Sequence, residues 1–310
     1  MISDATNGKA VSKRRAADHK RLVSGLLVGL FGLVVVGLGG WWFTIALGVI
    51  VHLGLLEFFR MAQFKGMRPA TKTTLVACQL LLISTQWSVN GGIASSLADA
   101  VLPLSGAAIC GWLLLQPITG SIADIAASIF GLFYLGFLPS HWLRLRNLEA
   151  VDVAPLVDHM SWTWISSGLL ITLMACLMVV ASDIGSYVIG RRFGHHPLSP
   201  ISPGKTIEGA YGGLASAVLL GALGGALLEW PYGPLAGGCL GALVALFALV
   251  GDLTESMMKR DAGVKDSGDA LPGHGGILDR IDSYLFTPAV VFYVVTLVMP
   301  VIAQGLTFQG

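Results

Sequence analysis

The sequence SMMKRDAGVKDSGDALPGHGGILDRID, residues 256–282, contains five acidic residues, four basic residues and one histidine. The segments on either side of it, about 235–257 and 284–303, are almost purely apolar. An apolar run of about 20 residues is long enough to cross a lipid bilayer as a helix. Residues 256–282 are therefore predicted to be a charged loop that joins two membrane-spanning helices.

Apolar runs of this kind recur along the whole chain of 310 residues, which is 54% hydrophobic and only 12% charged. Soluble domains average about 25% charged residues. The sequence therefore predicts an all-α fold, a polytopic integral membrane helix bundle with about nine transmembrane helices. The predicted spans are, by residue number, 22–38, 41–58, 73–88, 97–115, 121–139, 165–190, 207–228, 235–257 and 284–303.

The basic residues test this number of spans, because cytoplasmic loops carry the excess of Lys and Arg. Alternating spans place 17 of the 19 basic residues on the side of the N-terminal tail, and only Arg144 and Arg146 on the other side. We therefore expect the tail and the charged stretch 256–282 to be cytoplasmic. This pattern is typical of a multi-pass protein of a bacterial-type inner or plasma membrane.

The chain is expected to have three parts. Residues 1–21 form a cytoplasmic basic tail, residues 22–160 form N-terminal transmembrane helices, and residues 161–310 form a C-terminal transmembrane domain that includes the charged stretch. The sequence has no internal repeat that would divide it otherwise.

Acidic residues within or beside membrane spans are costly and usually functional. Two of them have a structural explanation: Glu57 is expected to pair with Arg60 at a membrane edge, and Asp124 to cap a helix start. The others are expected near the cytoplasmic mouth of the bundle. They are Asp183, Glu208, Asp252 and Glu255, together with Asp279 and Asp282, which share one face if the last helix begins at GILDRIDSYLF.

Clustered carboxylates repel one another unless a cation joins them. Mg²⁺ prefers one or two carboxylates together with the phosphates of a substrate, and lysine and arginine suit phosphate oxygens. The glycines of PGHGG, residues 272–276, let backbone amides approach an anion closely. The residues therefore predict a site for a polyphosphate with its metal ion. The basic residues beside the acids are Lys205, Lys259, Arg260, Lys265 and Arg280.

The charged stretch resembles the signature of the phosphatidate cytidylyltransferases, also called CDP-diacylglycerol synthases. Residues 182–209, SDIGSYVIGRRFGHHPLSPISPGKTIEG, also resemble this family, whereas the N-terminal half resembles it only as a bundle of apolar spans. The resemblance is carried by Ser256, Lys259-Arg260, Lys265-Asp266, Pro272, His274-Gly275-Gly276, Asp279-Arg280 and Asp282.

The resemblance implies a Mg²⁺-dependent enzyme that converts CTP and phosphatidate into CDP-diacylglycerol and pyrophosphate at the membrane surface, with 161–310 as its catalytic domain. It implies that Asp252 and Asp279 hold the metal centre, with Asp282 and Asp183 close by. It also implies a second, monovalent cation, K⁺, and a homodimer. The expected partners are CTP, phosphatidate and membrane lipid, with no nucleic acid.

On this basis each charged residue has a hypothetical role. Asp252, Asp279, Asp282 and Lys259 are the candidate catalytic residues. Ser202 and Thr206 are expected either to cap the helix near Ile207 or to donate to phosphate. The candidate substrate-binding residues are Ser202, Lys205, Thr206, Lys259, Arg260, Lys265, His274 and Arg280.

Two other functions fit parts of the sequence. An ion-coupled transporter would have acids inside its membrane spans, but near the midplane and often in two related halves, whereas here the charge gathers at one face. A cytidylyltransferase that acts on another lipid phosphate, such as a polyprenyl phosphate, also fits this sequence. Solute flux without nucleotide would distinguish the first alternative, and the choice of lipid acceptor the second.

Overall fold

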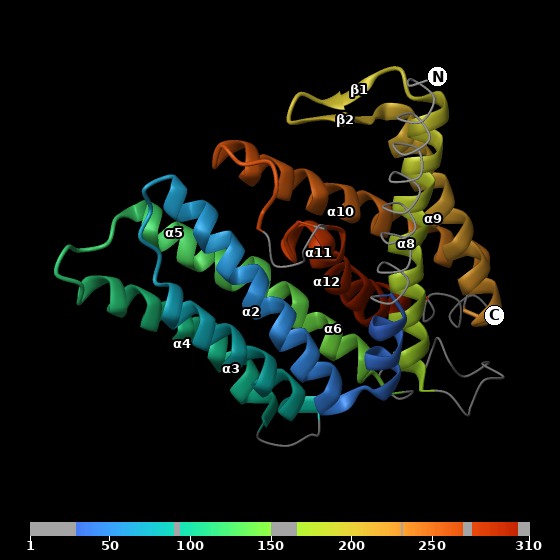
Figure 1. The fold of residues 1–310 in the computed structure, drawn as a ribbon. Coiled ribbons are helices and arrows are strands. Elements are labelled where there is room, and N and C mark those ends of the chain that lie inside the picture. The colour runs from blue at the N-terminus through green and yellow to red at the C-terminus, as the bar shows by residue number, and fades with distance from the viewer. Residues whose placement is uncertain (1–28, 90–93, 150–165, 231, 269–274, 303–310) are drawn as a thin grey trace, which may run out of the picture.

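The structure, a computed structural model, describes residues 29–89, 94–149, 166–230, 232–268 and 275–302. The predicted basic tail at 1–21, the predicted division after residue 160 and His274 lie outside the described residues. The described chain is built almost entirely of helices (Figure 1). After an apolar helix over Gly29–Leu38 come α2 (Gly40–Phe64), α3 (Thr71–Val89), α4 (Ala94–Leu114), α5 (Ile122–Gly131), η1 (Leu132–Phe137), α6 (Leu138–Arg146), α8 (Ser167–Phe193), α9 (Ile207–Leu227), α10 (Gly233–Asp261), α11 (Leu278–Leu285), α12 (Thr287–Tyr293) and η3 (Val294–Val298).

Seven of the described helical segments are long and apolar enough to cross a membrane, and the prediction of an all-α, multi-pass membrane bundle is confirmed. A described helix corresponds to each of the nine predicted spans. The first is described only as Gly29–Leu38, and the third is α3, which is less apolar than the seven. The seven are Gly40–Phe64, Leu97–Leu114, Ile122–Arg146, Ser167–Phe193, Ile207–Leu227, Gly233–Asp261 and Leu278–Ile302.

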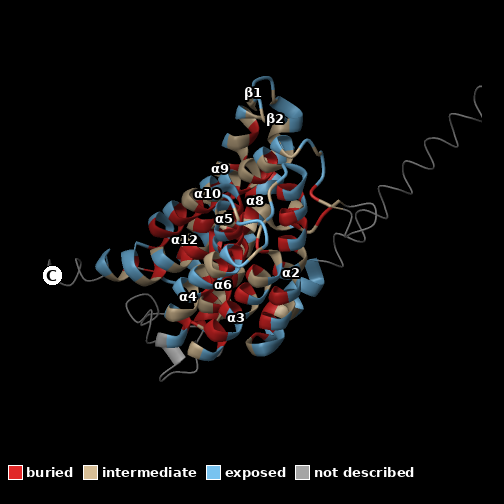
Figure 2. Cartoon of the chain, turned by 90° about the vertical axis from the view of Figure 1, so that its left-hand side faces the viewer, coloured by how far each residue is buried: buried red, intermediate tan, exposed pale blue. Residues whose placement is uncertain are grey.

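The helices α2 to α6 pack together on one side, and α8, α9 and α10 pack together on the other (Figure 1). The last helical segment, α11 with α12, lies between these groups and contacts α10, α8, α2 and α6. The interior of the bundle is buried, while much of the outer helix surface is exposed (Figure 2). Large apolar side chains on that outer surface suit a lipid environment, as Leu219 and Leu235 illustrate with 71% and 69% of their surface exposed.

The last helical segment begins earlier than its predicted span at 284–303, because α11 starts at Leu278. The sequence LDRIDSYL buries Leu278, Ser283 and Leu285 and leaves Asp279 and Asp282 on the less buried faces. Asp279 and Asp282, which belong to the predicted loop 256–282, therefore lie on the first turns of a helix that enters the bundle. This position brings Asp279 and Asp282 against α10 and α8.

A two-stranded antiparallel hairpin, β1 (Pro197–Ser199) and β2 (Ser202–Thr206), joins α8 to α9. It projects beyond the ends of these helices at the top of Figure 1. The sequence PLSPISPGKT did not predict it, because proline supplies no amide donor and is disfavoured inside sheets. The hairpin contacts α9 and α10 and thereby places Lys205 beside α10.

Helices α9 and α10 approach each other closely through glycines, because small residues let membrane helices pack with their backbones in contact. A Cβ atom at Gly237 would lie 2.9 Å from the carbonyl carbon of Gly221 and 2.9 Å from the backbone nitrogen of Gly225. Neither backbone atom can move away without separating the helices. At the next residue, Gly238, the nearest atoms would be at an ordinary 3.7 Å.

We therefore expect Gly237→Ala to destabilise the protein by about 1–3 kcal/mol, the usual range for overpacking. Gly238→Ala is the matched control, and we expect no loss of stability, because alanine favours helix more than glycine does. The measurement is the midpoint of thermal unfolding of each purified variant in detergent. Equal midpoints for the two variants would contradict the close approach at Gly237.

Candidate active site

Charged side chains from separate elements meet where α11 contacts α8, α10 and α2. Asp183 lies on α8, Asp252 on α10, Asp282 on α11, and Lys205 on β2. We call these four residues the aspartate set. Glu57 on α2, Glu255 and Lys259 on α10, and Asp279 on α11 form a second group, which we call the glutamate set.

The aspartate set is centred on an ion pair between Lys205 Nζ and Asp252 Oδ2. Asp282 and Asp183 interact electrostatically with both members of this pair and with each other. Ser283 connects them, because its backbone nitrogen donates to Asp282 Oδ1 at 2.7 Å and its hydroxyl donates to Asp183 Oδ1 at 3.4 Å. Carboxylates from three helices thus face the same lysine.

The glutamate set is centred on Lys259. Its ammonium group lies 2.5 Å from Glu255 Oε2, one helical turn earlier, and 2.6 Å from Asp279 Oδ1 on α11. Asp279 Oδ2 also accepts hydrogen bonds from Gly276 N at 2.9 Å and from Ser267 N and Oγ, both at 3.0 Å. Asp279 therefore joins both ends of the segment 267–276 to α10.

Glu57 was expected to pair with Arg60 at the membrane edge, and this prediction is wrong. Its side chain is buried, with 7% of its surface exposed, and accepts hydrogen bonds from Ile277 N and Leu278 N at 2.9 Å. Arg60 lies on the exposed side of the same helix, over the ring of Phe64. The side chain of Glu57 thus points inward, toward the charged stretch 256–282, because unpaired amides at the start of α11 provide better partners than an exposed guanidinium.

In the structure, the two aspartates that the resemblance assigns to one metal centre pair with different lysines. Asp252 contacts Lys205, whereas Asp279 contacts Lys259. Across the described parts of the chain, no group of three or more His, Cys, Asp and Glu side chains has a geometry that could hold a metal ion. The residues are nevertheless chemically suited to Mg²⁺, because the three carboxylates of the aspartate set supply oxygen ligands and outnumber its one lysine.

The candidate phosphate-binding residues are placed as follows. Thr206 caps α9, since its hydroxyl accepts a hydrogen bond from Gly209 N at 3.1 Å, which is one of its two predicted roles; donation to phosphate stays a prediction. Ser202 lies four residues before it on the same hairpin. Arg260 is exposed, and its Nε lies 3.4 Å from the carbonyl oxygen of Ile201, so it reaches the hairpin. Lys265 is exposed in the segment after α10, and Arg280 is exposed on the first turn of α11.

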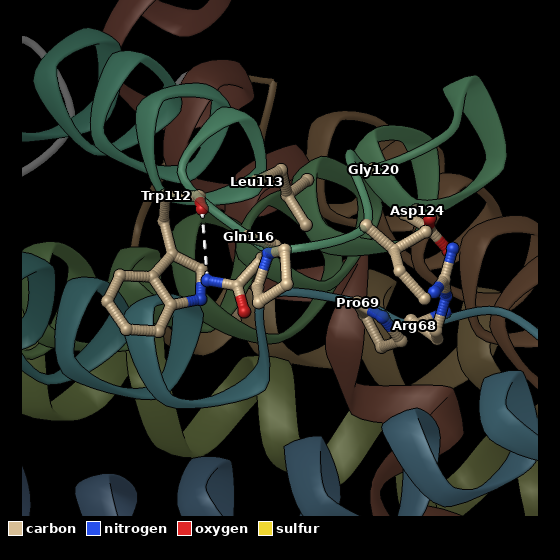
Figure 3. A pocket seen from close by; sticks show the side chains of 9 residues that line it. Arg68, Pro69, Trp112, Leu113, Gln116, Gly120 and Asp124 are labelled. Atoms are coloured by element: carbon tan, nitrogen blue, oxygen red, sulfur yellow. Dashed lines mark hydrogen bonds between the residues drawn. The ribbon is translucent and has the colours of Figure 1, made fainter.

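A pocket of about 310 Å³ lies elsewhere, between the segment before α3, the end of α4 and the start of α5 (Figure 3). Arg68, Trp112 and Asp124 are among its lining residues. Asp124 forms a capping box with Ser121 at the start of α5, and the prediction that it caps a helix is confirmed. None of the predicted site residues lines this pocket.

Comparison with known proteins identifies the family of the chain. A family model described as the cytidylyltransferase family matches residues 19–298. The chain belongs to the cytidylyltransferase family. A relative from Synechocystis, named phosphatidate cytidylyltransferase, is 45% identical over 91% of this chain and 98% of its own length. Phosphatidate cytidylyltransferase 4, chloroplastic, from Arabidopsis thaliana is 36% identical, over 94% of this chain and 76% of its own. Phosphatidate cytidylyltransferase from Bacillus subtilis is 28% identical, over 90% of this chain and 97% of its own.

Two residues of this member of the cytidylyltransferase family were missed by sequence reasoning. One is Glu57 in its contact with α11, and the other is Tyr134 on the π-helix η1. Tyr134 is fully buried, and its hydroxyl donates to the carbonyl oxygen of Gly251 at 3.5 Å, one residue before Asp252. Short π-helical segments are frequent at functional sites, but nothing in the sequence LFYLGF marks this one.

Proposed function

We propose that this protein is a phosphatidate cytidylyltransferase, which transfers CMP from CTP to phosphatidate and releases CDP-diacylglycerol and pyrophosphate. The observation that carries the proposal is the 45% identity, over 91% of the chain, to a protein named for this activity. The arrangement of charge supports it, because lysines and carboxylates gather at helices that are otherwise apolar enough to span a membrane. A lipid phosphate and a soluble nucleotide can meet at such a position.

The proposed reaction needs little proton chemistry. The headgroup of phosphatidate is a phosphate monoester with a second pKa of about 6, so at neutral pH it is mostly the dianion. One of its oxygens attacks the α-phosphorus of CTP, a new P–O bond forms, and the bond between the α-phosphorus and the α–β bridging oxygen breaks. Pyrophosphate leaves with that electron pair. The principal barrier is the approach of two anions, so catalysis is mainly positioning and electrostatic stabilisation.

The lysines of the two sets are proposed to bind phosphate oxygens. Lys205 and Lys259 are held in place by carboxylates, which keeps their ammonium groups fixed where charge accumulates during transfer. Arg260 and Lys265, both exposed, are proposed to bind the triphosphate as it enters, with Arg280 beside them. Ser202 is proposed to donate to phosphate from the hairpin, and His274 is proposed to donate to it from the signature.

The aspartates are proposed to hold Mg²⁺, with Asp252 and Asp282 as ligands and Asp183 beside them. A role for Asp279 as a further ligand is also proposed, and it would require Asp279 to exchange a contact with Lys259 for one with the ion. When bound, Mg²⁺ supplies positive charge to the triphosphate and to the departing pyrophosphate. A second, monovalent cation such as K⁺ and a homodimer stay predictions.

We further propose that the site faces the cytoplasm. The loops beside both sets belong to the side that carries 17 of the 19 basic residues. In this orientation CTP enters the site from the cytoplasm, and phosphatidate enters it sideways from the bilayer. Cysteine introduced at Asp261, whose side chain is 61% exposed, is expected to react with a membrane-impermeant reagent only from the cytoplasmic side; reaction from the outside would contradict the proposed orientation.

The proposed function is tested by incubating the purified protein in detergent with CTP labelled at the α-phosphate, phosphatidate and Mg²⁺. We expect a lipid-soluble labelled product that depends on all three components. Polyprenyl phosphate in place of phosphatidate is the control for acceptor choice, and we expect no product from it. Product from polyprenyl phosphate alone would assign a different lipid acceptor, and absence of any labelled lipid would contradict a cytidylyltransferase activity.

A further inference from the structure

Glu57 makes contacts that connect the N-terminal half of the chain to the signature. Its Oε1 accepts from Ile277 N at 2.9 Å, and its Oε2 accepts from Leu278 N at 2.9 Å and from Ser267 Oγ at 3.0 Å. These partners lie 210 to 221 residues away in the sequence. A buried carboxylate that accepts two amide hydrogen bonds, and shares the single hydroxyl hydrogen of Ser267 with Asp279, is strongly held, because hydrogen bonds to a charged group are stronger than neutral ones.

The two amides belong to the N-cap Ile277 and to Leu278, the first residue of α11, and amides at a helix start have no partner within their own helix. Ile277 precedes the helix and has no side chain that could cap it. The carboxylate of Glu57 therefore caps α11 from another helix, and its negative charge suits the positive end of the helix dipole. The position of Asp279 depends on this contact, because Asp279 is in the first turn of α11.

The backbone of the charged stretch 256–282 passes directly against this carboxylate at Gly268 and Gly276. A Cβ atom at Gly268 would lie 2.7 Å from Glu57 Oε1, and one at Gly276 would lie 2.8 Å from its Cδ. Both glycines therefore leave room for Glu57. Glu57 thus contacts both ends of the segment 267–278. A shorter or uncharged side chain at position 57 would weaken or lose these contacts.

Glu57 is also linked to Lys259 through shared partners. The hydroxyl of Ser267 lies 3.0 Å from Glu57 Oε2 and 3.0 Å from Asp279 Oδ2. Asp279 in turn holds the ammonium group of Lys259 at 2.6 Å. Loss of Glu57 would therefore release the start of α11 and the Ser267 hydroxyl at once, and both hold Asp279.

We propose that Glu57 is a positioning residue for the cytidylyl transfer: from α2 it fixes both ends of the segment 267–278 and so orients Asp279 and Lys259. The inference rests on the proposed function for the reaction that it serves. It assigns the N-terminal helices a direct part in the site, whereas the signature itself lies wholly in the C-terminal half. Glu57 itself is not placed in contact with substrate.

The test compares Glu57→Gln, Glu57→Asp and, as a matched control on the same helix, Arg60→Gln. We expect Glu57→Gln to lower kcat by about 10–100-fold, the usual effect of losing a residue that orients a site residue. The KM for CTP is expected to change less than threefold, because Glu57 does not bind it. Glu57→Asp keeps the charge and is expected to recover part of kcat, and Arg60→Gln is expected to keep kcat within twofold.

Hydrogen exchange at the amides of residues 277 and 278 provides a readout that needs no substrate. We expect at least tenfold faster exchange in Glu57→Gln than in the wild type and in Arg60→Gln. Unchanged exchange would show that Glu57 does not hold the start of α11. Faster exchange with kcat within twofold of the wild type would show that the contact of Glu57 has no part in the reaction. If the wild type made no CDP-lipid, the proposed function would fail, while the exchange comparison would still decide whether Glu57 holds this segment.

Discussion

Replacing Asp279 by asparagine is expected to lower kcat/KM by at least about 100-fold, the scale of losing one preorganised electrostatic group in an active site. The carboxylate holds Lys259, Gly276 and Ser267 in place together, through both oxygens. Asparagine keeps the size but presents an NH₂ group to one of these donors. Among the described residues, Lys259 would then keep Glu255 as its charged partner.

The matched control for this variant is Asp261→Asn. Asp261 lies at the end of α10, with 61% of its side chain exposed. It forms a surface ion pair in which Asp261 Oδ1 lies 3.1 Å from Lys65 Nζ. Exposed pairs contribute little to stability, so we expect kcat/KM to stay within twofold of the wild type. Steady-state turnover of CTP and phosphatidate measures both variants. Retention of more than a tenth of the wild-type kcat/KM by Asp279→Asn would show that Asp279 has no essential part.

Replacing Asp252 by asparagine is expected to raise the Mg²⁺ concentration needed for half-maximal turnover by at least about tenfold. It removes one carboxylate from the aspartate set and the charged partner of Lys205. Lys205 keeps Asp282 and Asp183 as neighbours, so the fold should survive the change. Turnover at low Mg²⁺ is expected to fall about 100-fold, and excess Mg²⁺ should recover part of it.

Asp124→Asn is the matched control for the loss of a buried carboxylate. Asp124 is 2% exposed and accepts hydrogen bonds from Ser121 N at 2.7 Å and Arg68 N at 2.5 Å, at the start of α5. This variant is expected to unfold at a lower temperature but to show an unchanged Mg²⁺ requirement. A Mg²⁺ requirement for Asp252→Asn equal to that of the wild type would contradict the role of Asp252 as a ligand.

The membrane helices could be predicted from the sequence because lipid requires long apolar segments, and each predicted span corresponds to a described helix. Contacts within one helix could also be predicted. Glu255 and Lys259 share one face of α10 because they are four residues apart, and Asp124 caps α5 through Ser121, three residues earlier. In each case the partners are close in the sequence.

The rest of the site depends on contacts between distant segments. Glu57 and Arg60 are three residues apart, a spacing that favours a local ion pair, yet the partners of Glu57 are at 277 and 278. The pairing of Lys205 with Asp252 depends on a hairpin whose prolines disfavour a strand prediction. The division of the aspartates between Lys205 and Lys259 likewise follows from the packing of α8, α10 and α11, which no spacing in the sequence specifies.

The most direct test of the account is an experimental structure of the protein with Mg²⁺ and a non-hydrolysable CTP analogue in lipid nanodiscs. We expect the triphosphate and the ion between α8, α10 and α11, with the ion bound by Asp252 and Asp282 and with Lys205 or Lys259 on the phosphates. Nucleotide bound elsewhere, for example in the pocket beside Arg68 and Trp112, with the aspartates still paired only to lysine, would contradict the account.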